Sequence, residues 1–291
     1  TDDSVLVLER LSAVSSQLSA IVTQPPRPVG RKHVITPTPV EIWAKDNTIP
    51  ILTFSSDSTT SSLYENEQTV IDTLDPFKEE LLISACYGQK IPNAAITSAR
   101  HGGLNVHPSL LPRWRGADPV PWAILSGDHQ TGVTVVTLSD AFDEGKIIAQ
   151  KKLPITNKDF SDPLRTKLFT LGAYLLIDSL PTFLASKGEA LKGSPEGKSD
   201  TPYARRLTRD DGFEPWKNIQ KAMENPDEAI RIDRKFRAFM PWPGLWTKIQ
   251  TTKRLKILAC HLSPESTLVL DTVQLEGKKP LDTDKLKLYG K

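Results

Sequence analysis

The feature that most constrains the fold is an alternation of short apolar runs with helical stretches along residues 1–186. Residues 81–87 form the most continuous apolar run, which is typical of an inner strand of a parallel sheet. Further strand-like runs follow at 103–107, 132–138 and 147–150, and a long helix is expected over about 161–186. Strands that alternate with helices indicate an α/β sheet covered on both faces.

Residues before this region predict a helix at 5–20, a buried strand at 20–23 and another strand at 51–54. Five prolines within 25–39 exclude a helix or an inner strand there, because proline removes a donor and fixes its torsion. Thr38 is the expected N-cap of a second helix that starts at Pro39.

The remaining third of the chain lacks this alternation of strands and helices. Residues 187–202 are rich in Gly, Ser, Pro and Lys, which is typical of a linker. Strand-like runs at 248–249 and 255–258 indicate a small, mostly β unit over 203–291.

Composition narrows the function classes. The hydrophobic fraction of 38% and charged fraction of 25% are those of a soluble globular protein. No apolar run approaches the roughly 20 residues that cross a bilayer, so no membrane partner is expected. Cys86 and Cys260 lie too far apart in sequence to indicate a disulfide framework. No metal-ligand cluster and no glycine-rich nucleotide fingerprint is visible, which disfavours metal, nicotinamide and ATP chemistry.

The net charge of +2 conceals an asymmetry. Residues 201–291 hold 18 Lys and Arg against 12 Asp and Glu, whereas the rest of the chain is mildly acidic. A basic C-terminal third suits a polyanionic partner on one side. A solvated lysine-rich surface explains the charge alone equally well.

Two residues of the strand at 103–107 suggest chemistry. Asn105 and His107 are two apart, so their side chains leave the same face, and Pro108 ends the strand beside them. An imidazole can move a proton near neutral pH, and an amide can donate to a developing oxyanion. Such a pair suits acyl transfer to an amine, although an isolated Asn-x-His is more often a hydrogen-bonded strand end.

A carboxylate is expected near this imidazole, to orient it and to stabilise its protonated form. Asp140, Asp143 and Glu144 follow the next strong strand and are the candidates.

The segment GLNVHPSLLPRWRGADP at 103–119 resembles the signature of the folate-dependent formyltransferases. It is most similar to the branch of that family that formylates initiator tRNA. Other matching segments lie at 22–31, 127–128, 131–134, 142–145, 203–207, 237–246 and 275–280.

The resemblance implies a Rossmann-like formyltransferase domain with a mostly parallel sheet at 1–186, a linker at 187–202 and a small OB-like C-terminal β-barrel at 203–291. It implies formyl transfer from 10-formyltetrahydrofolate, without a metal, to the α-amino group of methionyl-initiator-tRNA. Asn105 would hold the formyl oxygen and His107 would assist removal of the amine proton. Asp143 would orient His107 or polarise an ordered water.

The resemblance also assigns binding residues. The folate site would be lined by Ser109, Leu110, Leu111 and Pro112 on one wall and by Gly88, Gln89, Lys90 and Ile91 on the other. The tRNA would be contacted by Arg27, Arg31 and Lys32. Trp114 and Arg115 either contact substrate or pack their loop onto the sheet.

Two alternatives stay open. The same chemistry could act on a glycinamide ribonucleotide or an amino-sugar nucleotide, although such enzymes would not need the proline-arginine segment or a basic C-terminal unit. The second alternative is a non-catalytic RNA-binding relative, which is disfavoured because Asn105, His107 and Asp143 are all intact. The protein is expected to be a monomer of the mitochondrial matrix, with the bacterial cytoplasm as the alternative compartment.

The chain departs from the family pattern in several places, which include the folate wall at Gln89 and Lys90 and the segment around Arg27 and Arg31. The segment around Asp143 usually reads Leu-Asp-Thr-Gly, and here Phe142 and Glu144 flank the aspartate. Family members begin with a central strand ending in Phe-Gly-Thr, and this sequence starts at the threonine, so that strand is expected to be missing from the sequence as given. The C-terminal barrel is expected to be shortened between Pro264 and Gln274.

Overall fold

The computed structural model describes the chain except residues 15–17, 31, 55–65, 187–200, 250–252 and 284–291. It divides into two compact units. The first comprises residues 1–117, 132–153 and 165–203, and the second comprises 118–131, 154–164 and 204–291. Most of the predicted linker, 187–200, lies outside the described residues.

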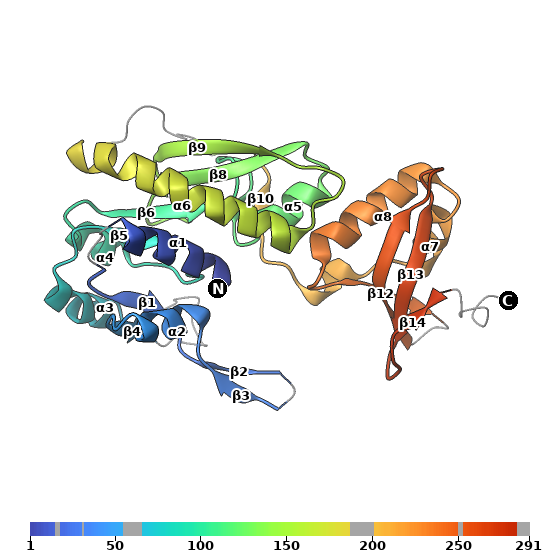
Figure 1. The fold of residues 1–291 in the computed structure, drawn as a ribbon, viewed down its shortest axis with the longest axis horizontal. Coiled ribbons are helices and arrows are strands. Elements are labelled where there is room, and N and C mark those ends of the chain that lie inside the picture. Colours follow the sequence, from blue (N-terminus) through green and yellow to red (C-terminus); the bar gives the residue numbers. More distant parts are fainter. Residues whose placement is uncertain (15–17, 31, 55–65, 187–200, 250–252, 284–291) are drawn as a thin grey trace. The chain divides into compact units, whose positions relative to one another are not determined.

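The helices and strands run in the following order (Figure 1). Up to the start of the predicted catalytic strand they are α1 (Asp2–Ala13), β1 (Ile21–Thr23), β2 (Arg27–Val29), β3 (Val34–Thr36), α2 (Pro39–Asp46), β4 (Ile51–Thr53), α3 (Glu67–Leu74), a 3₁₀ turn (Asp75–Phe77), β5 (Leu82–Ser84) and α4 (Asn93–Ser98). The middle of the chain forms β6 (Gly103–His107), β7 (Arg115–Gly116), α5 (Pro119–Leu125), β8 (Gln130–Thr137), β9 (Ile147–Pro154) and α6 (Ser161–Ala185). The last part forms β10 (Tyr203–Ala204), a 3₁₀ turn (Arg209–Gly212), α7 (Trp216–Ala222), α8 (Pro226–Phe239), β11 (Leu245–Ile249), β12 (Lys253–Leu262), β13 (Leu268–Leu275) and β14 (Leu281–Asp282).

The first unit contains a four-stranded sheet in the order β5-β6-β8-β9 and a separate parallel pair, β1 and β4. β5 is parallel to β6, whereas β8 is antiparallel to β6, with Asn105 opposite Val136 and His107 opposite Thr134. The expected α/β sheet is therefore confirmed, with one antiparallel neighbour at the strand that carries Asn105 and His107.

The strand predicted at 81–87 is shorter than expected. β5 covers three residues, because Cys86 adopts a left-handed backbone with φ of 53° and turns the chain out of the sheet. Among the described residues, β5 pairs with β6 alone, so it lies at an edge of this sheet and the prediction of an inner strand is wrong there.

The core of the first unit holds the β6 strand in place. Buried residues of α1, β6, β8 and α6 form one apolar cluster, which includes Val7, Leu104, Val135 and Phe169. Helix α6 packs closely because residue 172 is glycine: an added Cβ would lie 2.5 Å from Val106 Cγ1. The strand with the candidate catalytic residues is thus fixed from one face by a closely packed helix.

Helix α6 also corrects an expectation from the sequence. Its 25 residues, with a mean hydropathy of 1.5 in the most apolar stretch, make it long and apolar enough to cross a membrane by length and composition alone. Phe169, Ala173, Leu176 and Phe183 of this helix belong to the core cluster of the first unit. A core helix that covers a sheet has the same composition as a spanning helix, so this criterion does not separate the two.

The N-terminal elements agree in part with the sequence. The helix predicted at 5–20 starts earlier and ends at Ala13, and the Thr1 side chain caps it by accepting from the Ser4 N–H. Thr38 caps α2 by accepting from the Glu41 N–H, as expected. The proline-rich segment 25–39 forms an exposed antiparallel hairpin of β2 and β3 that extends from the rest of the first unit (Figure 1).

The second unit is built on an antiparallel sheet in the order β11-β12-β13-β14. Residues of α7, α8 and this sheet, among them Ile232, Phe236, Leu245 and Ile257, form its core. These antiparallel strands fit the expected small C-terminal barrel. Between Pro264 and Gln274 the chain forms a tight turn and β13, which pairs with β12.

A buried carboxylate ties the helices of the second unit together. The Glu214 side chain is 4% exposed and contacts Arg231, 2.6 Å away, and Lys235, 2.8 Å away. Burial by itself raises the pKa of Glu214, but hydrogen bonds from Arg231, Lys235 and Asn218 outweigh it and lower this pKa to about 2. Glu214 is therefore ionised at neutral pH and acts as a structural anchor.

Candidate active site

Strand β6 presents two polar side chains at its end. β6 is buried along most of its length and pairs on both sides, with β5 and with β8, so its side chains have fixed directions. Asn105 is half-buried and His107 is 3% exposed. Both side chains reach the same carboxylate, which confirms that they leave one face of the strand.

That carboxylate belongs to Asp143. Its Oδ1 accepts from Asn105 Nδ2 at 3.1 Å and lies 3.3 Å from His107 Nδ1. Its Oδ2 accepts from the Gly116 backbone N–H at 3.0 Å. The Asp143 side chain is 8% exposed, so this cluster is shielded from most of the solvent. Among the three candidate carboxylates Asp140, Asp143 and Glu144, Asp143 is the one that contacts the His107 imidazole.

The second ring nitrogen of His107 is also engaged. Nε2 lies 2.9 Å from the backbone oxygen of Trp114. A carbonyl oxygen only accepts, so in this contact Nε2 carries the hydrogen. Ser109 Oγ donates to the Arg113 carbonyl at 2.8 Å and also lies near Trp114 O, which helps to fix the loop. His107 is thus held between a backbone carbonyl and a carboxylate.

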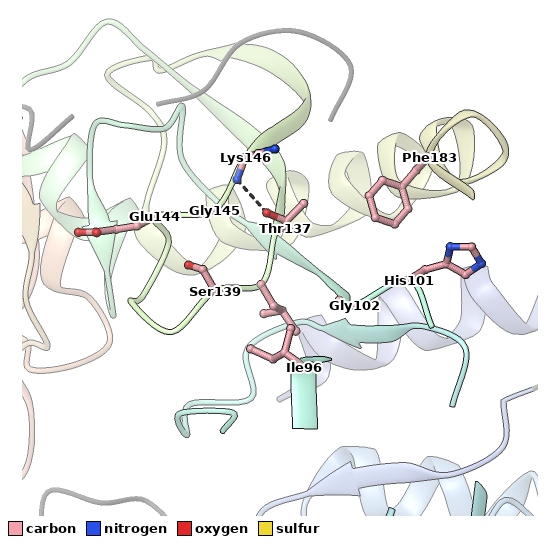
Figure 2. Close-up of a pocket in the computed structure, with 11 residues that line it drawn as sticks. Ile96, His101, Gly102, Thr137, Ser139, Glu144, Gly145, Lys146 and Phe183 are labelled. Carbon is pink, nitrogen blue, oxygen red and sulfur yellow. Dashed lines mark hydrogen bonds between the residues drawn. The ribbon is translucent and has the colours of Figure 1, made fainter. Parts of the chain in front are cut away.

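The loop that carries Asp143 is closed at its base. Thr137 N–H donates to Lys146 O at 2.9 Å, and Lys146 N–H donates to Thr137 Oγ1 at 2.8 Å (Figure 2). Residue 145 must be glycine for this approach, because an added Cβ would lie 1.8 Å from Thr137 O. Asp143 itself has a φ of 57°, in the left-handed region that Asp and Asn tolerate better than most side chains.

The other two candidate carboxylates hold the flanks of this loop. Asp140 pairs with Lys90 at 2.8 Å, and Glu144 pairs with Arg115 at 2.8 Å. The loop is therefore fixed on one side by the segment around Lys90 and on the other by β7.

The predicted folate-binding segment 88–91 lies next to this loop through the Lys90–Asp140 pair. Gly88 is exposed with a φ of 77°, and Gln89 is 5% exposed. Ile91 packs against the apolar cluster of Phe54, Val70, Leu74 and Ala95. Gly88 and Lys90 are the members of this wall that offer the most exposed surface.

The opposite predicted wall, 109–112, is held firmly by β8. Thr134 Oγ1 donates to Ser109 O at 2.7 Å and accepts from the Leu111 N–H at 3.2 Å. Ser109 and Leu111 are buried, whereas Leu110 and Pro112 are partly exposed. The segment therefore offers a rigid surface made mainly of Leu110, Pro112 and backbone.

The predicted tRNA-contacting residues lie on the hairpin of β2 and β3. Arg27 is exposed on β2 and donates to the Gln24 side chain, and Lys32 is exposed in the turn between the two strands. Arg31 lies outside the described residues. Arg27 and Lys32 are thus available to a large partner and are not part of the Asp143 cluster.

A separate cavity of about 410 Å³ lies at the other end of the β6–β8 pair (Figure 2). Its lining includes Ile96, His101, Leu138, Ser139, Lys146 and Phe183. Asn105, His107 and Asp143 do not line it, whereas Glu144 and Gly145 do, so the cavity borders the Asp143 loop without containing the candidate catalytic side chains. Figure 2 shows the Glu144 side chain extending away from His101 and Phe183.

Neither described cysteine is placed as a thiolate nucleophile. Burial raises the pKa of Cys86 to about 11, and burial also raises the pKa of Cys260, so both thiols are protonated at neutral pH. No group of three or more His, Cys, Asp or Glu side chains in that part is placed to hold a metal ion.

Sequence reasoning did not anticipate several members of the cluster. The Trp114 carbonyl, the Gly116 N–H and the Arg115–Glu144 pair all come from the segment that follows the 103–112 motif and from the loop after β8. Trp114 is 6% exposed, which fits the packing alternative for this residue. Backbone groups leave no side-chain signature, so the sequence pattern gave no signal for them.

Comparison with known proteins places these observations in a family. A family model described as formyl transferase matches residues 5–180, and a model described as formyl transferase, C-terminal domain, matches 224–268. The methionyl-tRNA formyltransferase of Listeria welshimeri is 38% identical over 247 residues, which cover 85% of this chain and 72% of the relative. That of Paramagnetospirillum magneticum is 31% identical over 265 residues, covering 91% and 80%.

Solved structures show the same fold at lower identity. The N-formyltransferase from Helicobacter canadensis, in complex with folinic acid and dTDP-3-aminofucose, has a TM-score of 0.59 at 17% identity and covers 90% of this chain and 84% of its own. HypX from Aquifex aeolicus in complex with tetrahydrofolic acid has a TM-score of 0.54 at 16% identity, covering 83% and 43%. The expected Rossmann-like formyltransferase fold is thus confirmed, and the chain belongs to the formyl transferase family.

Proposed function

We propose that the protein transfers the formyl group of 10-formyltetrahydrofolate to the α-amino group of methionyl-initiator-tRNA. The observation that carries this proposal is the single carboxylate, Asp143, that joins Asn105 and His107 in one shielded cluster. Family membership supplies the reaction class, and the relatives named for methionyl-tRNA support this acceptor over others.

The reaction requires one bond to form and one to break. The amine nitrogen attacks the formyl carbon, and the carbonyl oxygen becomes negative in a tetrahedral intermediate. The C–N bond to the folate nitrogen then breaks, the amine loses a proton and the folate nitrogen gains one. Catalysis therefore needs a donor at the oxyanion and a group that moves the proton.

The cluster provides both groups. Asn105 Nδ2 uses one hydrogen on Asp143, and its second hydrogen is available for the formyl oxygen. His107 assists removal of the amine proton, which requires that the ring carry its hydrogen on Nδ1, toward Asp143, and that Nε2 leave the Trp114 carbonyl and accept the proton from the substrate or from a water in contact with it. Asp143 orients the ring and stabilises its protonated form, or polarises an ordered water.

The folate donor is proposed to lie between the segments 88–91 and 109–112. Gly88 and Lys90 on one side and Leu110 and Pro112 on the other leave backbone and apolar surface for a flat pterin. Gln89, Ile91, Ser109 and Leu111 support these walls from within. The Lys90–Asp140 pair connects the first wall to the Asp143 loop.

The tRNA is proposed to contact the β2–β3 hairpin through Arg27, Arg31 and Lys32, and the basic unit at 203–291. An arginine fork suits phosphate oxygens. These features favour a nucleic-acid acceptor over a glycinamide ribonucleotide or an amino-sugar nucleotide, which would need neither. The division into a catalytic domain at 1–186, a linker at 187–202 and a tRNA-binding domain at 203–291 is part of this proposal, as is action as a monomer.

The compartment proposed is the bacterial cytoplasm. The relatives named above are bacterial, and they favour this alternative over the mitochondrial matrix that the sequence suggested.

The test compares three acceptors with one folate donor. Purified protein is given methionyl-tRNA, glycinamide ribonucleotide or an amino-sugar nucleotide, and formylated product is measured for the wild type and for His107→Ala. We expect formylation of methionyl-tRNA alone, reduced about 10³-fold in the variant, since general acid–base catalysis contributes about 10²–10⁴-fold. Full activity in the variant contradicts the role of His107. Turnover of a different acceptor contradicts the proposed substrate, and tRNA binding without any turnover supports the non-catalytic alternative.

A further inference from the structure

One ion pair lies directly beside the Asp143 cluster without touching the reacting atoms. Arg115 Nη1 is 2.8 Å from Glu144 Oε1. The Arg115 side chain is 16% exposed and that of Glu144 is 53% exposed, so the guanidinium is mostly enclosed and the carboxylate closes over it.

Three consecutive residues of one segment contact the catalytic cluster and its neighbour. The Trp114 carbonyl accepts from His107, the Arg115 guanidinium pairs with Glu144, and the Gly116 N–H donates to Asp143. The segments 114–116 and 143–144 are therefore joined by two adjacent contacts, one through the backbone and one through the ion pair.

We propose that Arg115 and Glu144 form a clasp that positions Asp143 for the reaction. The clasp holds the loop so that one Asp143 oxygen faces Asn105 and His107 while the other faces Gly116. This inference rests on the proposed function. In this proposal Arg115 and Glu144 are positioning residues, because they act on the reaction through Asp143.

The backbone at Asp143 explains why a clasp is useful. With φ of 57°, Asp143 holds a conformation that an L residue adopts only when its surroundings favour it. Gly145 and Thr137 fix the loop on its C-terminal side. The Arg115–Glu144 pair supplies the fixed point between Asp143 and that base.

The expected effect is on rate and not on stability. A partly exposed ion pair contributes little to folding stability. A catalytic group misplaced by about 1 Å can reduce the rate about 100-fold. Breaking the clasp should therefore lower kcat and leave both KM values and the melting temperature close to those of the wild type.

A different role for Arg115 predicts the opposite pattern. If its guanidinium binds a substrate phosphate and Glu144 merely shields it, removing the Glu144 charge should lower the KM for tRNA and leave kcat unchanged. The split between kcat and KM therefore distinguishes a positioning pair from a masked binding residue.

The experiment uses Glu144→Gln, the charge swap Arg115→Glu with Glu144→Arg, and Glu80→Gln as a matched control. Glu80 pairs with Arg100 at 3.5 Å in the same unit, and both side chains are exposed. We expect Glu144→Gln to lower kcat about tenfold, which lies below the loss for about 1 Å of displacement, and the swap to recover most of that loss. Glu80→Gln should match the wild type.

A second readout does not depend on the acceptor. The ring-nitrogen chemical shift of His107 reports its contact with Asp143, and Asp143→Asn provides the reference for a changed contact. In Glu144→Gln this shift should move toward that reference. The clasp is contradicted by an unmoved shift, by an unchanged kcat, or by a lower KM for tRNA at constant kcat. Because the shift is read on the free protein, it tests the clasp even when the wild type fails to formylate tRNA, which would contradict the proposed function alone.

Discussion

Two regions of the first unit hold the proposed functional residues in opposite environments. One region encloses them, and the other exposes them to solvent. The loop at 138–146 places Asp143 in a cluster with contacts from β6, β7 and the end of β8, and the Asp143 side chain is 8% exposed. The β2–β3 hairpin places Arg27 and Lys32 in the open, and its apolar residues Val29 and Ile35 are 56% and 63% exposed. Among the described residues, each hairpin strand pairs only with the other.

This difference follows from what each region would do. Proton transfer and oxyanion stabilisation require groups held to within a fraction of an ångström, which needs several independent contacts. Contact with a large polyanion needs charge on an accessible surface, and the partner itself can complete the ordering. Changes in the loop should therefore alter the rate of the chemical step, and changes in the hairpin should alter binding.

The largest effect is expected from Asp143→Asn. Asparagine has nearly the same shape and also tolerates a left-handed backbone, so the loop should keep its backbone conformation, while the charge facing His107 and one of the two hydrogen bonds accepted from Asn105 and Gly116 are lost. We expect kcat for methionyl-tRNA to fall about 10³-fold, with the melting temperature unchanged. A kcat within a factor of three of the wild type would remove Asp143 from the mechanism.

The next largest effect is expected from Gly145→Ala. The added Cβ would lie 1.8 Å from Thr137 O and 2.6 Å from Thr137 Oγ1, so the base of the loop must open. Overpacking of this kind costs about 1–3 kcal/mol. Chemical denaturation should show that loss, and kcat should fall because Asp143 moves with the loop. If the variant keeps the kcat of the wild type, the base of the loop does not position Asp143.

The smallest effect is expected from Arg27→Ala combined with Lys32→Ala. Removing two exposed cations should raise the KM for tRNA about tenfold and flatten its dependence on salt, because fewer phosphate contacts are lost on raising the salt. The KM for the folate donor should not change. Arg100→Ala, which removes an exposed cation elsewhere in the same unit, is the control. Equal effects from the control and the hairpin variant would mean that net charge matters and the hairpin does not.

The same contrast explains which features of the fold and of the candidate site could be predicted from the sequence. Asn105 and His107 could be placed on one face because the period of a strand is two, and Thr38 and Pro39 could be read as a helix start from capping chemistry alone. These are local rules, and they hold because the strand and helix they concern are regular.

Other features depend on contacts distant in sequence. Three carboxylates follow β8, and only the path of the loop, set by Gly145 against Thr137, brings Asp143 and not Asp140 or Glu144 to the imidazole. The antiparallel pairing of β8 with β6 and the end of β5 at Ser84, before the turn at Cys86, are likewise set by tertiary structure. The apolar run at 81–87 gives no indication that the strand ends so early.

The most direct test of the account is single-turnover formylation of methionyl-tRNA at saturating folate donor, measured over a range of tRNA concentrations. Asp143→Asn is expected to stay slow at every tRNA concentration, whereas the variant that combines Arg27→Ala with Lys32→Ala is expected to regain the wild-type rate when tRNA saturates. A wild-type rate for Asp143→Asn, or a hairpin variant that stays slow at saturation, would contradict the separation of chemistry from binding on which the account depends.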